Sequence, residues 1–138
     1  MKELTAAALQ TITGASGGSI ENWIARLSLA TSYEETVQGR ARRFSKENAV
    51  ELGVIANLVK QGMKPAAAAE VAAHLFEFMK SKKPRGFLTV FPGGNYTISD
   101  KPPSDTLLKY VSAVVVNVRQ LETEIEQYLA GADDNDEG

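Results

Sequence analysis

The chain has 138 residues, of which 43% are hydrophobic and 23% charged, and its formal net charge is −2. This balance is typical of one globular domain with a modest core, and it excludes a disordered or membrane-embedded chain. With no cysteine and a single histidine, His74, the chain is not expected to form disulfides or a structural metal site. Acidic residues gather at the C-terminal end, whereas residues 40–46 and 80–85 are locally basic, so local charge decides which partners fit.

The N-terminal stretch MKELTAAALQ lacks the basic start, apolar centre and small-residue cleavage site of a signal peptide. No apolar run reaches the roughly 18 residues that a transmembrane helix needs. We therefore expect a cytoplasmic protein with no membrane partner.

Two short helices joined by a glycine turn are predicted first. Thr5 is placed to cap a helix over residues 6–10, and Gly14 to end it. Ser16 or Ser19 then caps a helix over residues 16–27 whose apolar residues share one face. Those apolar residues are Ile20, Trp23, Ile24 and Leu27. The order helix, turn, helix is typical of a helix-turn-helix, although other small helical proteins also contain it.

Residues 30–43 have no helical period and end in a basic cluster, which indicates a short hairpin or an extended wing. Ser45 is expected to cap a helix that is apolar on more than one face, as a central core helix would be, and Gly62 to end it. Pro65 opens the next helix, which is predicted to run to residue 80. We expect Phe44 to fill the core beneath the wing and Trp23 to be a core residue.

A β-hairpin is predicted over residues 87–91 and 96–99, around the turn Pro92-Gly93-Gly94-Asn95. Two strands alone are marginal in water, so the hairpin must pack on a helix or pair with another copy. A last helix is predicted over residues 105–129, with an apolar stripe at alternating steps of three and four that suits dimerisation. The stripe consists of Val111, Val114, Val118, Leu121, Ile125 and Tyr128. Residues 131–138, GADDNDEG, are expected to form a disordered acidic tail.

With these elements placed, residues 4–76 resemble the winged helix-turn-helix domain of the MerR family of bacterial transcription regulators. The most specific feature is RRFSKENAVELGVIANLVKQGM, in which a basic pair, an aromatic residue, a helix cap and a terminating glycine keep the family's spacing. The segments Gly14-Ala15-Ser16 and Leu27-Ser28-Leu29 also match the family's order of features. The chain departs from the family at Glu21 and Asn22, where the family usually has Arg and Tyr, and in lacking the cysteines of its metal and redox sensors.

The predicted elements and the resemblance together give a mainly α fold. It consists of a winged helix-turn-helix domain over residues 1–80, which the resemblance implies, then a basic linker and β-hairpin over 81–104, a dimerisation helix over 105–130, and the acidic tail over 131–138. The resemblance implies a short, prophage- or plasmid-borne transcription regulator that binds double-stranded DNA in a sequence-specific manner. Because the last helix is expected to pair two subunits, we expect a homodimer that binds an inverted repeat and associates with the bacterial nucleoid when bound. We expect neither a cofactor nor a small-molecule effector.

In this interpretation the helix over residues 16–27 enters the major groove and the wing over residues 32–43 follows the DNA backbone. An asparagine such as Asn22 suits adenine, because its amide binds N6 and N7 together. The residues expected to contact DNA are Ser16, Ser19, Asn22, Arg26, Arg40, Arg42, Arg43 and Lys46.

No catalytic triad, Walker-type loop or dinucleotide-binding glycine motif can be assembled from this sequence, so we do not expect an enzyme. His74 is interpreted as an ordinary helical residue. Two other functions fit the same elements. One is a protein-interaction adaptor that uses the hairpin and the heptad helix, and the other is an excisionase-like architectural factor that binds DNA.

Overall fold

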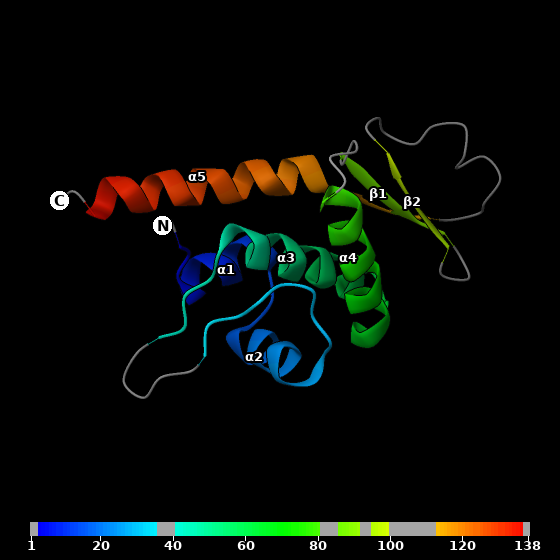
Figure 1. The fold of residues 1–138 in the computed structure, drawn as a ribbon, viewed down its shortest axis with the longest axis horizontal. Coiled ribbons are helices and arrows are strands. Elements are labelled where there is room, and N and C mark those ends of the chain that lie inside the picture. The colour runs from blue at the N-terminus through cyan, green and yellow to red at the C-terminus, as the bar shows by residue number, and fades with distance from the viewer. Residues whose placement is uncertain (1–2, 36–40, 81–85, 92–94, 100–112, 137–138) are drawn as a thin grey trace.

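The computed structural model of the chain describes residues 3–35, 41–80, 86–91, 95–99 and 113–136. Across these ranges the protein is mainly helical, with one small antiparallel sheet (Figure 1). None of their helices is both long enough and apolar enough to cross a bilayer. The elements in chain order are α1 (Ala6–Thr13), α2 (Gly17–Arg26), α3 (Lys46–Lys60), α4 (Pro65–Lys80), β1 (Phe87–Val90), β2 (Tyr96–Ser99), β3 (Val114–Asn117) and α5 (Val118–Asp136).

The predicted caps of the first three helices are confirmed, as are the glycines that end α1 and α3, although α1 runs to Thr13 rather than to residue 10. The side chains of Thr5, Ser16 and Ser45 each accept a hydrogen bond from a backbone N–H in the first turn of α1, α2 and α3. Gly14 and Gly62 follow α1 and α3 with φ angles of 74° and 102°, in the left-handed region that favours glycine. The turn between α1 and α2 is therefore closed by local hydrogen bonds at both ends.

The central helix of the fold is α3, as its distribution of apolar residues predicted. It packs against α1, α4 and α5, and Figure 1 shows α5 on one side of it and α2 on the other. Phe44 and Trp23 are both buried, which confirms their assignment to the core. The largest buried apolar side chains of α3 are Val50, Leu52, Val54, Ile55 and Leu58.

The antiparallel pairing of the two predicted hairpin strands is confirmed, and a third strand extends their sheet to the order β2-β1-β3. Residues 92–94 of the predicted turn lie outside the described residues. On the central strand, Leu88 lies opposite Ile98 on one side and Val116 on the other, so the three side chains share a face. This face belongs to the hydrophobic core. The sheet thus joins the helices as part of one core.

The helix predicted over residues 105–129 is wrong at its start, because residues 114–117 form β3 and α5 begins at Val118. Three consecutive β-branched valines favour an extended backbone. A third strand also stabilises a hairpin that would be marginal alone. At its other end α5 continues to Asp136, into the segment expected to be disordered. Val111 lies outside the described residues.

The apolar stripe of α5 packs inside its own chain. Val118, Leu121 and Ile125 are buried, as is Leu129, whereas Tyr128 is 40% exposed. Burial therefore passes from Ile125 to Leu129, which follows a straight helix rather than a heptad seam. The predicted assignment of Val118, Leu121 and Ile125 to a dimer seam is corrected to the core of the monomer. The stripe's Val114 lies on β3, half-buried at the core face of the sheet.

Gly53 allows this close packing of α5 on α3. A Cβ atom at position 53 would lie 2.8 Å and 2.9 Å from the two Cδ atoms of Leu121. We expect Gly53→Ala to lower the free energy of unfolding by about 1 kcal/mol, because the overlap outweighs alanine's helix propensity. Leu121→Ala alone should cost about 2–4 kcal/mol.

The double variant Gly53→Ala, Leu121→Ala tests this contact directly. Removing the Leu121 side chain leaves room for the new methyl group. The double variant should therefore lose less free energy of unfolding than the two single variants lose in sum, by about 1 kcal/mol or more. Urea unfolding of the four proteins in the cycle measures it. Strict additivity would show that the two positions do not touch.

Candidate nucleic-acid interface

One side of α2 faces solvent. Ile20 and Trp23 turn into the core, while Ser19, Asn22 and Arg26 follow one another at steps of three and four and so share a face. Asn22 and Arg26 are exposed, and Ser19 is half-buried. Because α2 lies at the edge of the molecule on the side of α3 opposite α5 (Figure 1), this stripe is accessible to a large partner.

A hollow of about 300 Å³ lies where the first turn of α2 meets the C-terminal half of α3. Its lining includes Ser16, Ser19, Trp23 and Lys60. The Ser16 hydroxyl accepts from the Ser19 N–H at 3.1 Å and donates to the Ser19 hydroxyl at 3.0 Å, which fixes both side chains. The first N–H groups of a helix and a nearby lysine are favourable partners for a phosphate oxygen. The exposed stripe of α2 therefore begins at a place suited to an anion.

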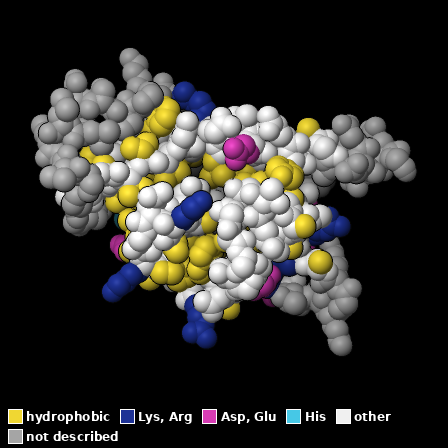
Figure 2. Space-filling view, turned by 180° about the vertical axis from the view of Figure 1, so that it is seen from behind, with side chains coloured by type: hydrophobic (Ala, Val, Ile, Leu, Met, Phe, Trp, Pro, Cys, Tyr) yellow, Lys and Arg dark blue, Asp and Glu magenta, His cyan; other side chains and the backbone are white. Residues whose placement is uncertain are grey.

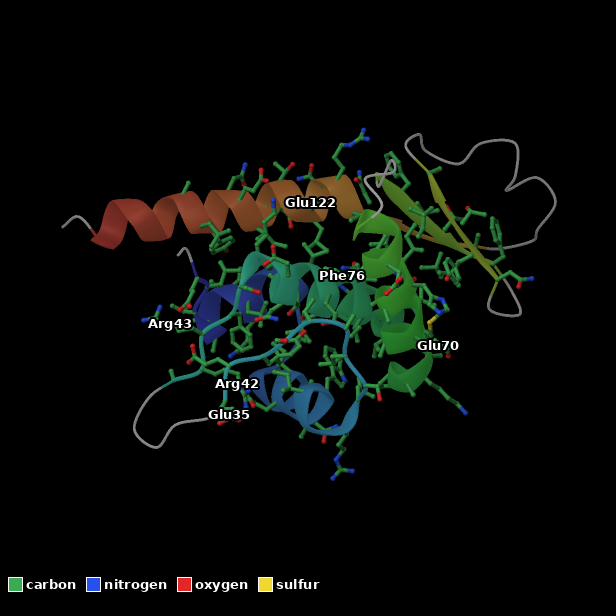
Figure 3. The ribbon with its side chains drawn as sticks, in the orientation of Figure 1. Glu35, Arg42, Arg43, Glu70, Phe76 and Glu122 are labelled. Atoms are coloured by element: carbon green, nitrogen blue, oxygen red, sulfur yellow. The ribbon has the colours of Figure 1, made fainter. Side chains whose placement is uncertain are left out.

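Arg42 joins the end of the predicted wing to α2. Its Nε atom donates to Glu21 Oε1 at 3.2 Å, and its Nη2 atom lies 3.1 Å from Glu21 Oε2. Its Nη1 atom donates to the backbone carbonyl of Glu34. The Arg42 side chain is 13% exposed, and Figure 3 shows it directed toward the helices. Arg42 is therefore an internal partner that offsets the charge of Glu21, not the exposed phosphate ligand that was predicted.

Glu51 holds the loop that leaves α2. This residue of α3 is fully buried. Its carboxylate accepts hydrogen bonds from the backbone N–H groups of Ala30 at 2.5 Å and Thr31 at 3.1 Å. It also accepts from the hydroxyls of Thr31 at 2.6 Å and Tyr33 at 2.9 Å. A buried carboxylate is tolerated when hydrogen bonds replace its hydration, so these four donors make the loop and α3 one unit.

Asn48 adds a second attachment one turn earlier on α3. Its Nδ2 atom donates to Thr31 Oγ1 at 2.9 Å and to the Ser32 carbonyl at 3.0 Å. Its Oδ1 atom accepts from the Ser45 N–H at 3.0 Å, which closes the capping box of α3. One side chain thus starts the helix and positions the loop.

Burial raises the pKa of the Tyr33 hydroxyl, with a further increase from the charge of Glu51, so Tyr33 remains a hydrogen-bond donor. This network was not predicted from the sequence. Its signal was an acidic residue, Glu51, within the apolar run of α3, because an unpaired charge there requires several donors.

The other predicted DNA contacts separate in space. Arg43 is exposed, and Figure 3 shows it pointing away from the helices. Lys46 instead lies 2.7 Å from Glu126 and 4.0 Å from Glu122, so its charge is directed to α5. The hydrogen bond from Lys46, together with its positive charge, lowers the pKa of Glu126. Arg40 lies outside the described residues.

The predicted wing is only partly described, and its described parts, residues 32–35 and 41–43, contain no strand. Side chains of α3 hold the first of these parts, because Asn48 donates to the Ser32 carbonyl and Glu51 accepts from the Tyr33 hydroxyl. The far end is held by an isolated bridge, in which Leu4 and Phe44 exchange backbone hydrogen bonds of 2.7 Å and 3.0 Å. Residues 36–40 lie outside the described residues.

His74 contacts the sheet at a distance from α2. Its Nδ1 atom shares a hydrogen bond with the Tyr96 hydroxyl, and the two rings stack with centroids 5.8 Å apart. Burial raises the pKa of the Tyr96 hydroxyl, and the charge of Glu70 raises it further. No group of His, Cys, Asp and Glu side chains suited to a metal ion occurs among the described residues. We interpret the pair as a link between α4 and β2.

Basic side chains do not form a single patch on the side of the molecule that Figure 2 shows. Lys and Arg residues appear there as separate points among polar and apolar groups. The structure brings Ser16, Ser19, Asn22 and Arg26 together on α2, beside the internal pair of Arg42 and Glu21. Comparison of the chain with protein-family models and with curated proteins finds no match.

Proposed function

We propose that this protein is a sequence-specific, DNA-binding regulator of transcription that acts as a homodimer on an inverted-repeat operator. In the proposal α2 enters the major groove, and the segment from residue 30 to residue 43 follows the neighbouring backbone. Phosphate contacts would set the position of the protein, and contacts to base edges would set its sequence preference.

The observation that carries the proposal is the ion pair between Arg42 and Glu21. It holds the two segments that would contact DNA side by side, because one residue ends the wing segment and the other lies on α2. It also offsets the acidic charge on α2 that would otherwise repel phosphate. The exposed face of α2 is then left with Ser19, Asn22 and Arg26, which carry hydrogen-bonding groups and positive charge.

The side chains of this face and of the cap of α2 have distinct proposed roles. Asn22 would read a base, since an amide binds the N6 and N7 edge of adenine in a bidentate manner. Arg26 would bind either guanine or a phosphate. Ser16 and Ser19 would contact phosphate through the first turn of α2, next to Lys60 in the hollow.

The primary test is selection of bound sequences from a random pool of double-stranded DNA at low salt. An enriched inverted repeat would support the function and the two-fold symmetry together. Enrichment of one unrepeated half-site would contradict the dimer. Absence of any retained DNA, even at low salt, would contradict the DNA-binding function and leave the adaptor. Bending of the DNA with no effect on a nearby promoter would favour the architectural factor.

We expect Arg26→Ala to weaken binding to the selected operator, and Asn22→Ala to relax the preference at one base pair by about 1–3 kcal/mol. If Arg26 binds phosphate, its loss should also reduce the dependence of log K on log salt by about one. Gel shifts over a range of salt concentrations measure both effects.

The matched control is Arg119→Ala. Arg119 is also an exposed arginine, but it lies in the first turn of α5, on the opposite side of α3 from α2. Its removal should leave both affinity and salt dependence unchanged. Equal losses in the Arg26 and Arg119 variants would show that α2 is not the contact surface.

A further inference from the structure

Among the described residues β3 is one of the two outer strands of the sheet, and backbone hydrogen bonds show how its groups are directed. The N–H of Phe91 donates to the carbonyl of Asn95 at 2.7 Å, so these two residues form the hydrogen-bonded pair that closes the hairpin. Hydrogen-bonded and non-bonded pairs alternate along an antiparallel ladder. Thr89 therefore bonds toward β2, while Leu88 and Val90 bond toward β3.

This alternation fixes the direction of the backbone groups of β3. Leu88 and Val90 pair with Val116 and Val114, so those two valines direct their N–H and C=O groups toward β1. Val115, between them, directs both groups away from the sheet. Its side chain is 43% exposed, and no hydrogen bond to its outward groups occurs in the part of the chain that the structure describes.

Soluble proteins usually protect an open edge strand with a charge, a proline or a bulge. From Ala113 to Asn117 the sequence is AVVVN, with neither a charged residue nor a proline. The segment has high β propensity, because its centre is three valines. Within the described ranges, this edge therefore has both the unpaired backbone groups and the side chains that strand addition requires.

We propose that β3 pairs antiparallel with β3 of a second copy of this chain, about a two-fold axis at Val115. In this register Val115 of each copy donates its N–H to the Val115 carbonyl of the other, and Ala113 lies opposite Asn117. No like charges oppose each other across the axis, so the strand is complementary to itself. The assignment rests on the homodimer of the proposed function and names the surface that joins its two copies.

Two features of the molecule favour a second copy at this edge. Val118, Leu121 and Ile125 of α5, which were expected to join two subunits, are instead buried against their own chain. The sheet also lies well apart from α2 in Figure 1, so pairing there leaves both copies of α2 free for DNA.

The test uses the full chain without DNA, so that it is independent of the DNA-binding proposal. Val115→Pro removes the outward N–H but spares the β1 ladder, which uses Val114 and Val116; proline is tolerated at such edge positions. We expect the wild type to sediment as a dimer at micromolar concentration. The proline variant should raise the dissociation constant of the dimer about a hundredfold, because each copy loses its own N–H donor and two hydrogen bonds across the axis disappear. The matched control, Val115→Thr, keeps the N–H and should remain a dimer.

Val115→Lys is a second variant that keeps the backbone donor but places two positive charges opposite each other. It should also dissociate the dimer, which keeps the test decisive if the proline variant misfolds. Exchange of the Val115 amide hydrogen should slow with rising wild-type concentration and not with rising Val115→Lys concentration. The proposal is overturned if the wild type is monomeric at about 100 μM, a concentration well above the affinity range of typical specific complexes. It is also overturned if the dimer persists in both folded variants.

Discussion

Replacing Glu51 with glutamine should lower the free energy of unfolding by about 2–4 kcal/mol, although the side chain keeps its size. The carboxylate accepts four hydrogen bonds in a fully buried position. A glutamine offers one oxygen and an NH₂ group, so at least one donor of the loop would face another donor. Urea unfolding at neutral pH measures the loss, and faster exchange of the Ala30 and Thr31 amide hydrogens would locate it.

Glu47→Gln is the control for this prediction. Glu47 lies in the first turn of the same helix but is exposed, so its replacement should change stability by no more than about 0.5 kcal/mol. Equal unfolding midpoints for the Glu51 and Glu47 variants would show that the buried network contributes nothing. If the Glu51 variant folds, it should also bind DNA more weakly, because the loop beside α2 would be released.

The second large effect is expected from a charge on the buried side of α5. Val118 is fully buried, so Val118→Asp should lower the free energy of unfolding by about 3–5 kcal/mol. That loss is a large fraction of the roughly 5–15 kcal/mol that stabilises a typical domain. Circular dichroism at 25 °C followed by urea unfolding measures it.

Tyr128→Asp is the matched substitution on the same helix. Tyr128 belongs to the same predicted stripe but is 40% exposed, so the change should cost less than about 1 kcal/mol. A Val118 variant that unfolds like the wild type but no longer associates would restore the heptad stripe as a dimer seam. It would also contradict the pairing proposed through β3.

The helix boundaries could be predicted because their determinants are local. A cap such as Ser16 or Ser45 bonds to an N–H three residues away, and Gly14 ends its helix through its own backbone angle. The central position of α3 was also predictable, since a helix that is apolar on several faces must be covered on several faces.

The sequence did not predict β3, because the choice between helix and strand for its valines depends on a distant strand. Val114 fitted a helical stripe equally well, and only its pairing with Val90 on β1 makes the extended form favourable. The site was hidden for the same reason. Arg42 and Glu21 are 21 residues apart, as are Glu51 and Ala30, and nothing in the intervening sequence specifies that they meet.

The absence of any linker between β3 and α5 has a consequence for how far apart two copies of α2 can lie. Asn117 ends the strand and Val118 begins the helix, which Gly53 seats tightly on α3, the helix that also carries Glu51. If two chains pair through β3, each α2 is then connected to the two-fold axis by packed elements alone. Such a dimer would accept only one distance between its half-sites. Adding a few base pairs to the centre of the operator should abolish binding, whereas a dimer with flexible connections would tolerate the insertion.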